Sequence, residues 1–267
     1  MYSLHLVCEA DDVDAVSTEL WEAGTCGIRE LDLADGRVRL IAGFEGNEAR
    51  ESLLRTFSEH SPEWTAEANT DWVAETRRSW PGRRVGSRFF LAPPWCEELT
   101  PAECIRLIHN PGLACGTGEH PCTRLALAAL EQVVTPKSRV ADIGTGSGML
   151  AIAALQLSAQ CALGVDTDEA ALAAARENFA LNGLPYSLAV GSADCLQTQS
   201  ADIVVANISP SVLLAISDEL LRVVRPGGAL ILTGFQEIEA ETISEVFPPE
   251  LLLAEEAWVC FISRVSW

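Results

Sequence analysis

The chain has 267 residues, enough to bury a large core, and its composition of 48% hydrophobic and 21% charged residues is typical of globular proteins. Its formal net charge of -20 is unusual, because 38 acidic residues stand against 18 lysines and arginines. Such a surface repels phosphate backbones and anionic membranes, which argues against nucleic acid or a membrane as the main partner and favours a basic protein or a cationic small molecule. The same charge is equally consistent with a role in solubility alone.

The amino terminus and the cysteines indicate the compartment. No signal-peptide pattern opens the chain, and no apolar run approaches the roughly 20 residues that span a bilayer. The nine cysteines form no C-x-x-C pair, and most lie within apolar runs. This pattern indicates reduced, buried thiols rather than a disulfide framework, so we expect a cytoplasmic protein.

The first 70 residues alternate between strand and helix patterns. Strand patterns fall at 2–8, 27–33, 37–44 and 63–69, and helical spacing of apolar residues falls at 12–23 and 47–59. The order strand, helix, strand, strand, helix, strand is that of the ferredoxin-like split motif. We therefore predict a small α+β ferredoxin-like domain over residues 1–70.

Residues 71–98 have the composition of a connector. Trp72, Arg77, Arg78 and Trp80 precede Pro81-Gly82, and a short strand pattern, RFFLAP, follows. Tryptophans beside arginines can form a cation–π surface for a partner, but we favour rings that pack between two domains. We predict an interdomain linker over 71–98.

From residue 99 to 267, apolar strand patterns alternate with amphipathic helices. The strand patterns are RVADIG, ALGVD, SLAVG, DIVVANI and GALILTGF, and the helices fall at 122–133, 148–158, 168–181 and 210–224. This alternation predicts a mainly parallel sheet with both faces covered by helices. The tail, LLLAEEAWVCFISRVSW, predicts two further strands that form an antiparallel pair at the edge.

The strongest functional signal is a glycine turn at 140–148, VADIGTGSG, followed by a helix and then by Asp166 at the end of the next strand. In a doubly wound sheet this layout binds a nucleoside cofactor, because the glycines admit the ligand and the carboxylate accepts from the ribose hydroxyls. A dinucleotide site would need a third glycine where Met149 stands. The G-x-G-x-G spacing from Gly144 and Gly146, together with the acidic strand end, favours the cationic S-adenosylmethionine (SAM). Asp168 is available to cap the next helix, which leaves Asp166 for the ribose.

Two further polar residues follow strand patterns in the same region. Asp194, after the third strand, is placed to accept from the adenine amino group, and a loop or cap role is equally open. Asn207 ends the fourth strand, where an amide can reach cofactor or substrate. In the tetrapeptide NISP that begins there, Pro210 stands where base and amide methyltransferases carry an aromatic residue, which argues against a planar acceptor.

A second glycine loop, PGLACGTGEHPCT, covers 111–123 and places Thr123 in the first turn of the following helix. Cys115, His120 and Cys122 lie close together in this loop, but their spacing matches no standard zinc ligand set. We therefore predict no metal site.

The loop PGLACGTGEHPCTRLALAAL, the core VADIGTGSGMLAIAALQL, DIVVANI and RPGGALILTGF together resemble the PrmA family of ribosomal protein L11 methyltransferases. The resemblance covers most of the chain from about residue 71. It implies a class I methyltransferase fold with a Rossmann-like, mostly parallel seven-stranded sheet over 99–267, and a substrate-recognition role for the domain at 1–70. It further implies that Thr123, Gly144, Asp166 and Asn207 bind SAM, and that methyl groups pass to lysine and α-amino nitrogens of ribosomal protein L11, a basic protein substrate.

The loop departs from the family pattern at Cys115, where the family usually has phenylalanine, and at Glu119 and Cys122, where it usually has threonine. These departures leave the acceptor open between ribosomal protein L11, another protein lysine and a small amine. A module that binds SAM without catalysis is a further alternative. The expected chemistry is in-line attack of a neutral amine on the sulfonium methyl, and the sequence identifies no catalytic base.

Overall fold

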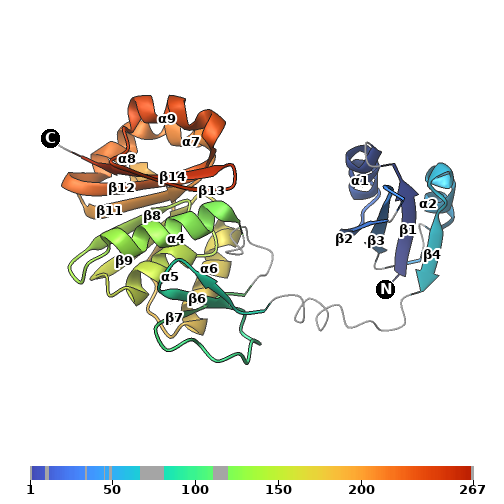
Figure 1. The fold of residues 1–267 in the computed structure, drawn as a ribbon, viewed down its shortest axis with the longest axis horizontal. Helices are drawn as coiled ribbons and strands as arrows, with labels where there is room; N and C mark the ends of the chain where they lie inside the picture. The colour runs from blue at the N-terminus through green and yellow to red at the C-terminus, as the bar shows by residue number, and fades with distance from the viewer. Residues whose placement is uncertain are drawn as a thin grey trace. The chain divides into compact units, whose positions relative to one another are not determined.

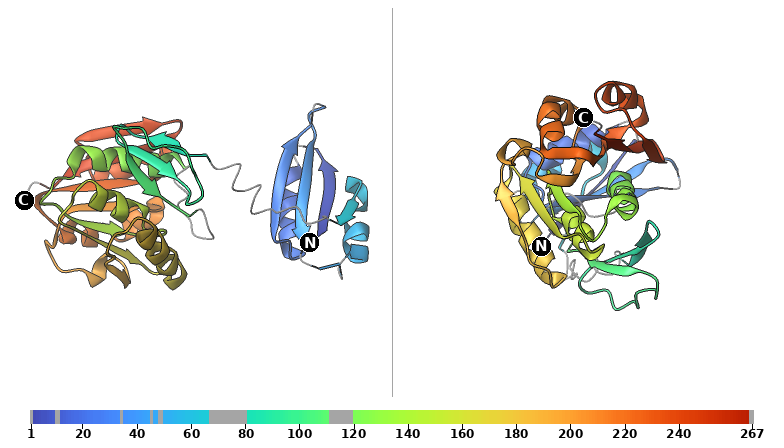
Figure 2. Two further views of the ribbon diagram at one scale, coloured as in Figure 1. Left: turned by 90° about the horizontal axis from the view of Figure 1, so that it is seen from below. Right: turned by 90° about the vertical axis from the view of Figure 1, so that its left-hand side faces the viewer.

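The structure is a computed structural model that describes residues 2–9, 12–33, 35–44, 46–47, 50–66, 81–110 and 120–265. The chain divides into two compact units, Met1–Thr76 and Arg77–Trp267, which are described separately here (Figure 1). Figure 2 shows each unit from two further directions. Within the described ranges, no helix has both the length and the apolar character needed to cross a bilayer.

The first unit is a four-stranded antiparallel sheet with the strand order β2-β3-β1-β4. Its elements are β1 Tyr2–Cys8, α1 Val13–Glu22, β2 Gly27–Asp32, β3 Val38–Phe44, α2 Arg50–Thr56, a 3₁₀ turn Ser58–His60 and β4 Glu63–Ala66. Alternate residues of the central strands, such as Leu4, Leu6 and Leu40, pack against Leu20 of α1 and Leu53 of α2. Both helices therefore cover the same face of the sheet, and the predicted ferredoxin-like arrangement is confirmed.

The second unit is built on a seven-stranded sheet with the order β10-β9-β8-β11-β12-β14-β13. The strands are β8 Arg139–Ile143, β9 Cys161–Asp166, β10 Leu188–Val190, β11 Ala201–Asn207, β12 Val224–Gln236, β13 Leu251–Glu255 and β14 Trp258–Arg264. The first five run parallel, while β14 lies antiparallel to both β12 and β13. The predicted mostly parallel sheet with an antiparallel pair at its edge is confirmed.

Helices cover both faces of this sheet (Figure 1). They are α4 Pro121–Val133, α5 Met149–Gln156, α6 Glu169–Leu181, α7 Pro210–Ala215, α8 Ser217–Val223 and α9 Ala240–Val246, with 3₁₀ turns at Ala193–Cys195 and Glu237–Glu239. Neighbouring residues of β8 show the division: Val140 packs with α4 and α5, and Ala141 packs in the opposite core with α7 and α8. Strands buried on both faces explain why their sequences are apolar without alternation.

The single helix predicted over 210–224 is wrong, because it is interrupted at one residue. Ile216 has φ -108° and ψ 18°, outside helical geometry, and it separates α7 from α8. Leu213 and Leu220, one on each side of the break, are both fully buried in the same core. Apolar spacing predicted the buried face correctly but carries no signal for a break that leaves that face intact.

Residues 83–108 add a small three-stranded sheet to the second unit, with the order β5-β6-β7. Its strands are β5 Arg83–Val85, β6 Phe89–Ala92 and β7 Ile105–Ile108. Val85, Phe89 and Leu107 are buried in the core that α4 and α5 also form. The described part of the expected linker thus packs as part of the second unit, whereas Trp72, Arg77, Arg78 and Trp80 lie outside the described residues.

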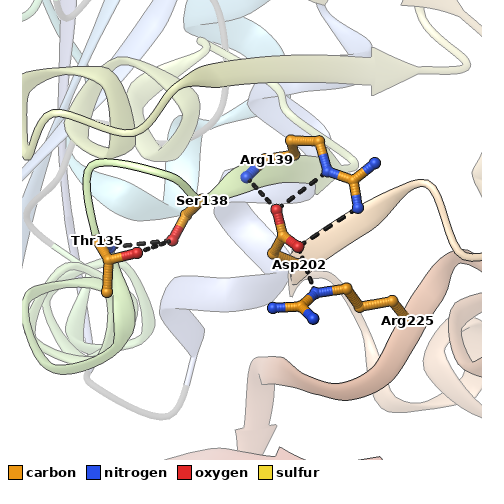
Figure 3. A network of polar contacts seen from close by, with 5 residues as sticks. All are labelled: Thr135, Ser138, Arg139, Asp202 and Arg225. Atoms are coloured by element: carbon orange, nitrogen blue, oxygen red, sulfur yellow. Dashed lines mark hydrogen bonds and ion pairs between the residues drawn. The ribbon is translucent and has the colours of Figure 1, made fainter.

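A polar network joins β8 and β11 at their amino ends (Figure 3). Asp202 accepts hydrogen bonds from the backbone N of Arg139 at 2.7 Å and from its guanidinium, and it also pairs with Arg225. Burial raises the pKa of Asp202, but the hydrogen bonds and charges of the two arginines outweigh this and hold the pKa below its usual range. Thr135 and Ser138 close the adjoining turn before β8. This network stabilises the end of the sheet away from the glycine turn.

Candidate active site

A cavity of about 1240 Å³ lies at the carboxyl ends of the parallel strands of the second unit. Its lining includes Asn110, His120, Thr123, Gly144, Gly146, Asp166, Asn178, Ser192, Asn207 and Ile208. This volume is sufficient for a nucleoside cofactor, because typical small-molecule sites measure roughly 300–1,000 Å³. Its position is the one at which doubly wound sheets bind ligands.

The glycine turn forms one wall of the cavity. Gly144 and Gly146 have φ of +68° and +53°, a backbone region that glycine adopts without steric cost. A Cβ on Gly144 would also overlap the Cγ2 atom of Ile208, which follows β11. The N–H groups of Gly144 and Thr145 donate to the carbonyl oxygen of Val165 at 2.9 and 3.0 Å. The turn is therefore held against β9 with its backbone next to the cavity.

Asp142, in β8, stabilises the glycine turn through two hydrogen bonds. Its Oδ2 atom accepts from the hydroxyl of Thr145 at 2.7 Å and from the backbone N of Ala151 at 3.1 Å. Its Oδ1 atom is buried and has no hydrogen-bond partner among the described residues. Burial raises the pKa of Asp142 to about 6, although the two hydrogen bonds oppose that shift.

Asp166 ends β9, and its carboxylate is oriented by two backbone donors. Oδ2 accepts from the N–H of Gly146 at 2.8 Å, and Oδ1 accepts from the N–H of Asp168 at 3.0 Å. Asp168 accepts from the N–H of Ala170 and caps α6, as its position predicted. Because a carboxylate oxygen accepts more than one hydrogen bond, Asp166 can also accept from a ligand in the cavity.

Thr123 and Asn207 also line the cavity and contact each other, although they lie far apart in the sequence. The Nδ2 atom of Asn207, at the end of β11, donates to the hydroxyl of Thr123 in α4 at 3.3 Å. Nearby, His120 caps α4 by accepting from the N–H of Cys122, and its ring lies edge-on to Trp258 at 4.5 Å between centroids. Across the described residues, no group of three or more His, Cys, Asp or Glu side chains could hold a metal ion.

The structure brings five of the six predicted cofactor-binding residues to one cavity: Thr123, Gly144, Gly146, Asp166 and Asn207. Asp194 lies in the 3₁₀ turn after β10 with its side chain exposed and outside the lining, although its neighbour Ser192 lines the cavity. Cys115 and Glu119 lie outside the described residues. The side chain of Cys122 is buried in α4, and burial raises the pKa of its thiol.

Asn110, Ser192, Ile208 and Asn178 also line the cavity, and the sequence analysis missed them. Ser192 and Ile208 follow the ends of β10 and β11, so the rule that ligands bind at the carboxyl ends of strands could have found them. Asn178 lies inside a helix, where a single asparagine carries no functional signal.

These residues fit SAM. Two glycines with positive φ leave room for close approach of a ligand to the backbone, and an oriented carboxylate stands at the strand end, where it can accept from ribose hydroxyls. The fold and this cavity together define a SAM-dependent methyltransferase of the class I type.

Comparison with known proteins then identifies the family. The family model described as ribosomal protein L11 methyltransferase (PrmA) matches residues 11–266, and the chain belongs to this family. It is 35% identical over 240 residues to the ribosomal protein L11 methyltransferase of Symbiobacterium thermophilum, covering 87% of this chain and 77% of that relative. It is 36% identical over 253 residues to the enzyme of the same name from Pseudomonas paraeruginosa, covering 88% and 84%.

A solved structure supports the same relationship. The ribosomal protein L11 methylase from Lactobacillus delbrueckii subsp. bulgaricus superposes with a TM-score of 0.63 at 31% identity. The match covers 70% of this chain and 100% of that one.

Proposed function

We propose that this chain transfers methyl groups from SAM to lysine and α-amino nitrogens of ribosomal protein L11 in the cytoplasm. The observation that carries the proposal is the cavity lined by Asp166, the glycine turn and the Thr123–Asn207 pair, in a chain whose relatives are named for this substrate. In this proposal the unit at 1–70 recognises the substrate, 71–98 connects it to the catalytic part while β5 and β6 pack on that part, and 99–267 catalyses.

Asp166 would accept from the ribose hydroxyls, and the backbone at Gly144 and Gly146 would lie against the cofactor. Asp194 as a contact of the adenine amino group stays a prediction. SAM, when bound, supplies a methyl group activated by the positive sulfonium. The chain's own residues supply alignment and a site from which water is excluded.

In this proposal Thr123 and Asn207 contact SAM, and Asn207 also orients the acceptor amine. Since Nδ2 of Asn207 donates to Thr123, the Oδ1 atom of Asn207 is the one left to accept from an amine N–H. A lysine ammonium with a pKa near 10.4 must first lose a proton, which costs about 5 kcal/mol at pH 7. In the proposal water takes this proton before alignment, and Asn207 then holds the nitrogen lone pair toward the methyl group.

The net charge of -20 supports a basic protein as the acceptor. An acidic surface attracts a basic partner over several ångströms and speeds encounter at low ionic strength. The same surface disfavours nucleic acid and anionic membranes as partners.

The proposal is tested by transfer of labelled methyl groups from SAM to purified ribosomal protein L11, with mass spectrometry to locate and count the methyl groups. The same mass spectrometry recognises self-labelling, because the amines of this chain are its α-amino group and a single lysine, Lys137, in the turn before β8 at the end of the sheet away from the cavity. Methylation of the protein L11 at lysine and α-amino groups is expected. If only another protein or a small amine is labelled, that molecule is the acceptor instead of ribosomal protein L11. If the chain binds SAM but transfers no methyl group, it is a non-catalytic SAM-binding module.

We predict that Asp166→Ala weakens SAM binding about 100-fold, because hydrogen bonds to a charged group contribute about 1.5–3 kcal/mol each. Calorimetric titration of the full chain with SAM measures this. Asp218→Ala is the control, since it removes the same charge from an exposed position in α8 outside the lining. An unchanged affinity in the Asp166 variant would remove this carboxylate from the cofactor site.

A further inference from the structure

Asn178 is a polar residue in the middle of α6 that is buried, with 2% of its surface exposed, and lines the cavity. Its Nδ2 atom donates to the carbonyl oxygen of Ser147 in the glycine turn at 3.0 Å. Its Oδ1 atom accepts from the backbone N of Asn110, just after β7, at 3.0 Å. One side chain thus joins two segments of the cavity wall, one that follows β8 of the seven-stranded sheet and one that follows β7 of the three-stranded sheet.

Both partners lie where regular structure ends. Ser147 stands between Gly146 and Gly148, whose φ values of +53° and +80° take the chain out of β8 and into α5. Asn110 follows the last residue of β7, after His109 has made its bond to the carbonyl oxygen of Ala92. Backbone groups at such points have no partner within a regular helix or strand, so they depend on side chains or water for hydrogen bonds.

We infer that Asn178 is a positioning residue for methyl transfer, which holds the cofactor-binding glycine turn and the Asn110 wall at a set separation. The inference rests on the proposed function for the identity of the reaction. The Ser147 carbonyl lies next to Gly146, whose N–H orients Asp166, so movement of this turn changes the orientation of the carboxylate. Asn178 acts through these groups and not on the reacting atoms.

Asn182, one helical turn later, provides a matched control. Its side chain accepts from the N–H of Ile108 at 2.9 Å and donates to the carbonyl oxygen of Ile108 at 2.7 Å. It also donates to the backbone carbonyl of Asn178 at 2.7 Å, a group that the Asn178 substitutions leave in place. It therefore ties β7 to α6 with comparable hydrogen bonds but does not contact the glycine turn and does not line the cavity. Loss of Asn182 affects the attachment of β7, whereas loss of Asn178 also affects the glycine turn.

The test compares Asn178→Ala, Asn178→Asp and Asn182→Ala in the full chain. Thermal unfolding, calorimetric titration with SAM alone, and the kcat and KM for SAM are measured for each. The Asp variant keeps the acceptor for Asn110 but loses the donor to Ser147. It therefore isolates the contact with the glycine turn, and it provides the test if the Ala variant does not fold.

Both Asn178 variants are expected to bind SAM about tenfold more weakly and to lower kcat, the size expected from loss of one or two buried hydrogen bonds. Asn182→Ala is expected to lower the melting temperature while its affinity for SAM stays within about twofold of wild type. The inference is overturned if the Asn178 variants change only the melting temperature, or if Asn182→Ala loses as much affinity. Because titration with SAM needs no acceptor, failure of ribosomal protein L11 as the substrate would leave this result readable.

Discussion

Two glycines of the second unit show how the same backbone conformation has different consequences at different places. Gly144 and Gly183 have φ of +68° and +65°, so alanine at either position must adopt a disfavoured conformation. An added Cβ at Gly183 would meet nothing within 4 Å, whereas at Gly144 it would overlap Ile208. The difference between the two substitutions therefore reports on packing at the glycine turn.

We predict that Gly183→Ala lowers the free energy of unfolding by about 1 kcal/mol, and that Gly144→Ala lowers it by about 2–4 kcal/mol. Gly144→Ala should also weaken SAM binding, because Gly144 and Ile208 both line the cavity and the overlap forces one of them to move. Chemical denaturation and calorimetric titration measure the two effects. Equal stability of the two variants with unchanged SAM affinity would contradict the tight packing at Gly144.

Asp142 predicts a particular dependence of stability on pH. Its pKa is about 6 in the folded chain against an ordinary 3.8. Between these values the folded state keeps a proton that the unfolded state has released, so the free energy of unfolding falls as pH rises through this window. The contribution that is lost amounts to about 3 kcal/mol at most.

Asp142→Asn removes this titration. We predict that its free energy of unfolding, relative to wild type, increases by about 2–3 kcal/mol between pH 4 and pH 7. Denaturation of both proteins across this range provides the measurement. The buried His109, whose pKa is lowered to about 4 by burial, is present in both and cancels in the difference. Parallel pH profiles would show that Asp142 does not titrate in this range.

At the scale of the elements, each end of the parallel sheet has a different role. The carboxyl ends carry the glycine turn and Asp166, where the backbone is irregular and open to a ligand. The amino ends of β8 and β11 are joined by Asp202, which is largely buried and accepts from the backbone of Arg139 (Figure 3). This separation lets one end of the sheet be stabilised without cost to the site.

We predict that Asp202→Ala lowers the free energy of unfolding of the second unit by about 2 kcal/mol, with no change in SAM affinity. Most of this comes from the bond to the Arg139 backbone, because the two guanidinium groups are about half exposed and screened by water. The control is Glu250→Ala, which removes an exposed ion pair with Arg264 and should cost less than about 0.5 kcal/mol. A smaller effect for Asp202 than for Glu250 in denaturation experiments would refute this assignment.

For the whole molecule, the excess of acidic residues dominates the electrostatics. A net charge of -20 repels itself in the compact state, and salt screens this repulsion over a Debye length of about 10 Å at 0.1 M and 3 Å at 1 M. We predict that the melting temperature rises by a few degrees as NaCl increases from about 0.02 to 0.5 M. Since screening depends on ionic strength, KCl should give the same curve. A melting temperature that is constant or falls with salt would show that self-repulsion is unimportant.

Much of the fold, and the residues of the site that lie at strand ends, could be predicted from local patterns. Apolar runs separated by helices predicted the parallel sheet, and the rule that carboxyl strand ends share one edge brought Gly144, Asp166 and Asn207 together. The break at Ile216 could not be predicted, because both sides of it keep the same buried face. The short strand predicted at RFFLAP corresponds to β6, whereas β5 and β7 were missed, because strands of three or four residues give little periodic signal.

The sequence by itself determined the two kinds of domain, the glycine turn and the acid at the end of β9, since each depends on residues close together in the chain. Only the tertiary structure decided that Thr123 contacts Asn207, that Asn178 joins Ser147 to Asn110, and that Asp194 lies outside the cavity lining. Side-chain hydrogen bonds between distant segments depend on the position and orientation of the helices on the sheet. This position and orientation result from packing of the whole core, which cannot be predicted from a local sequence pattern.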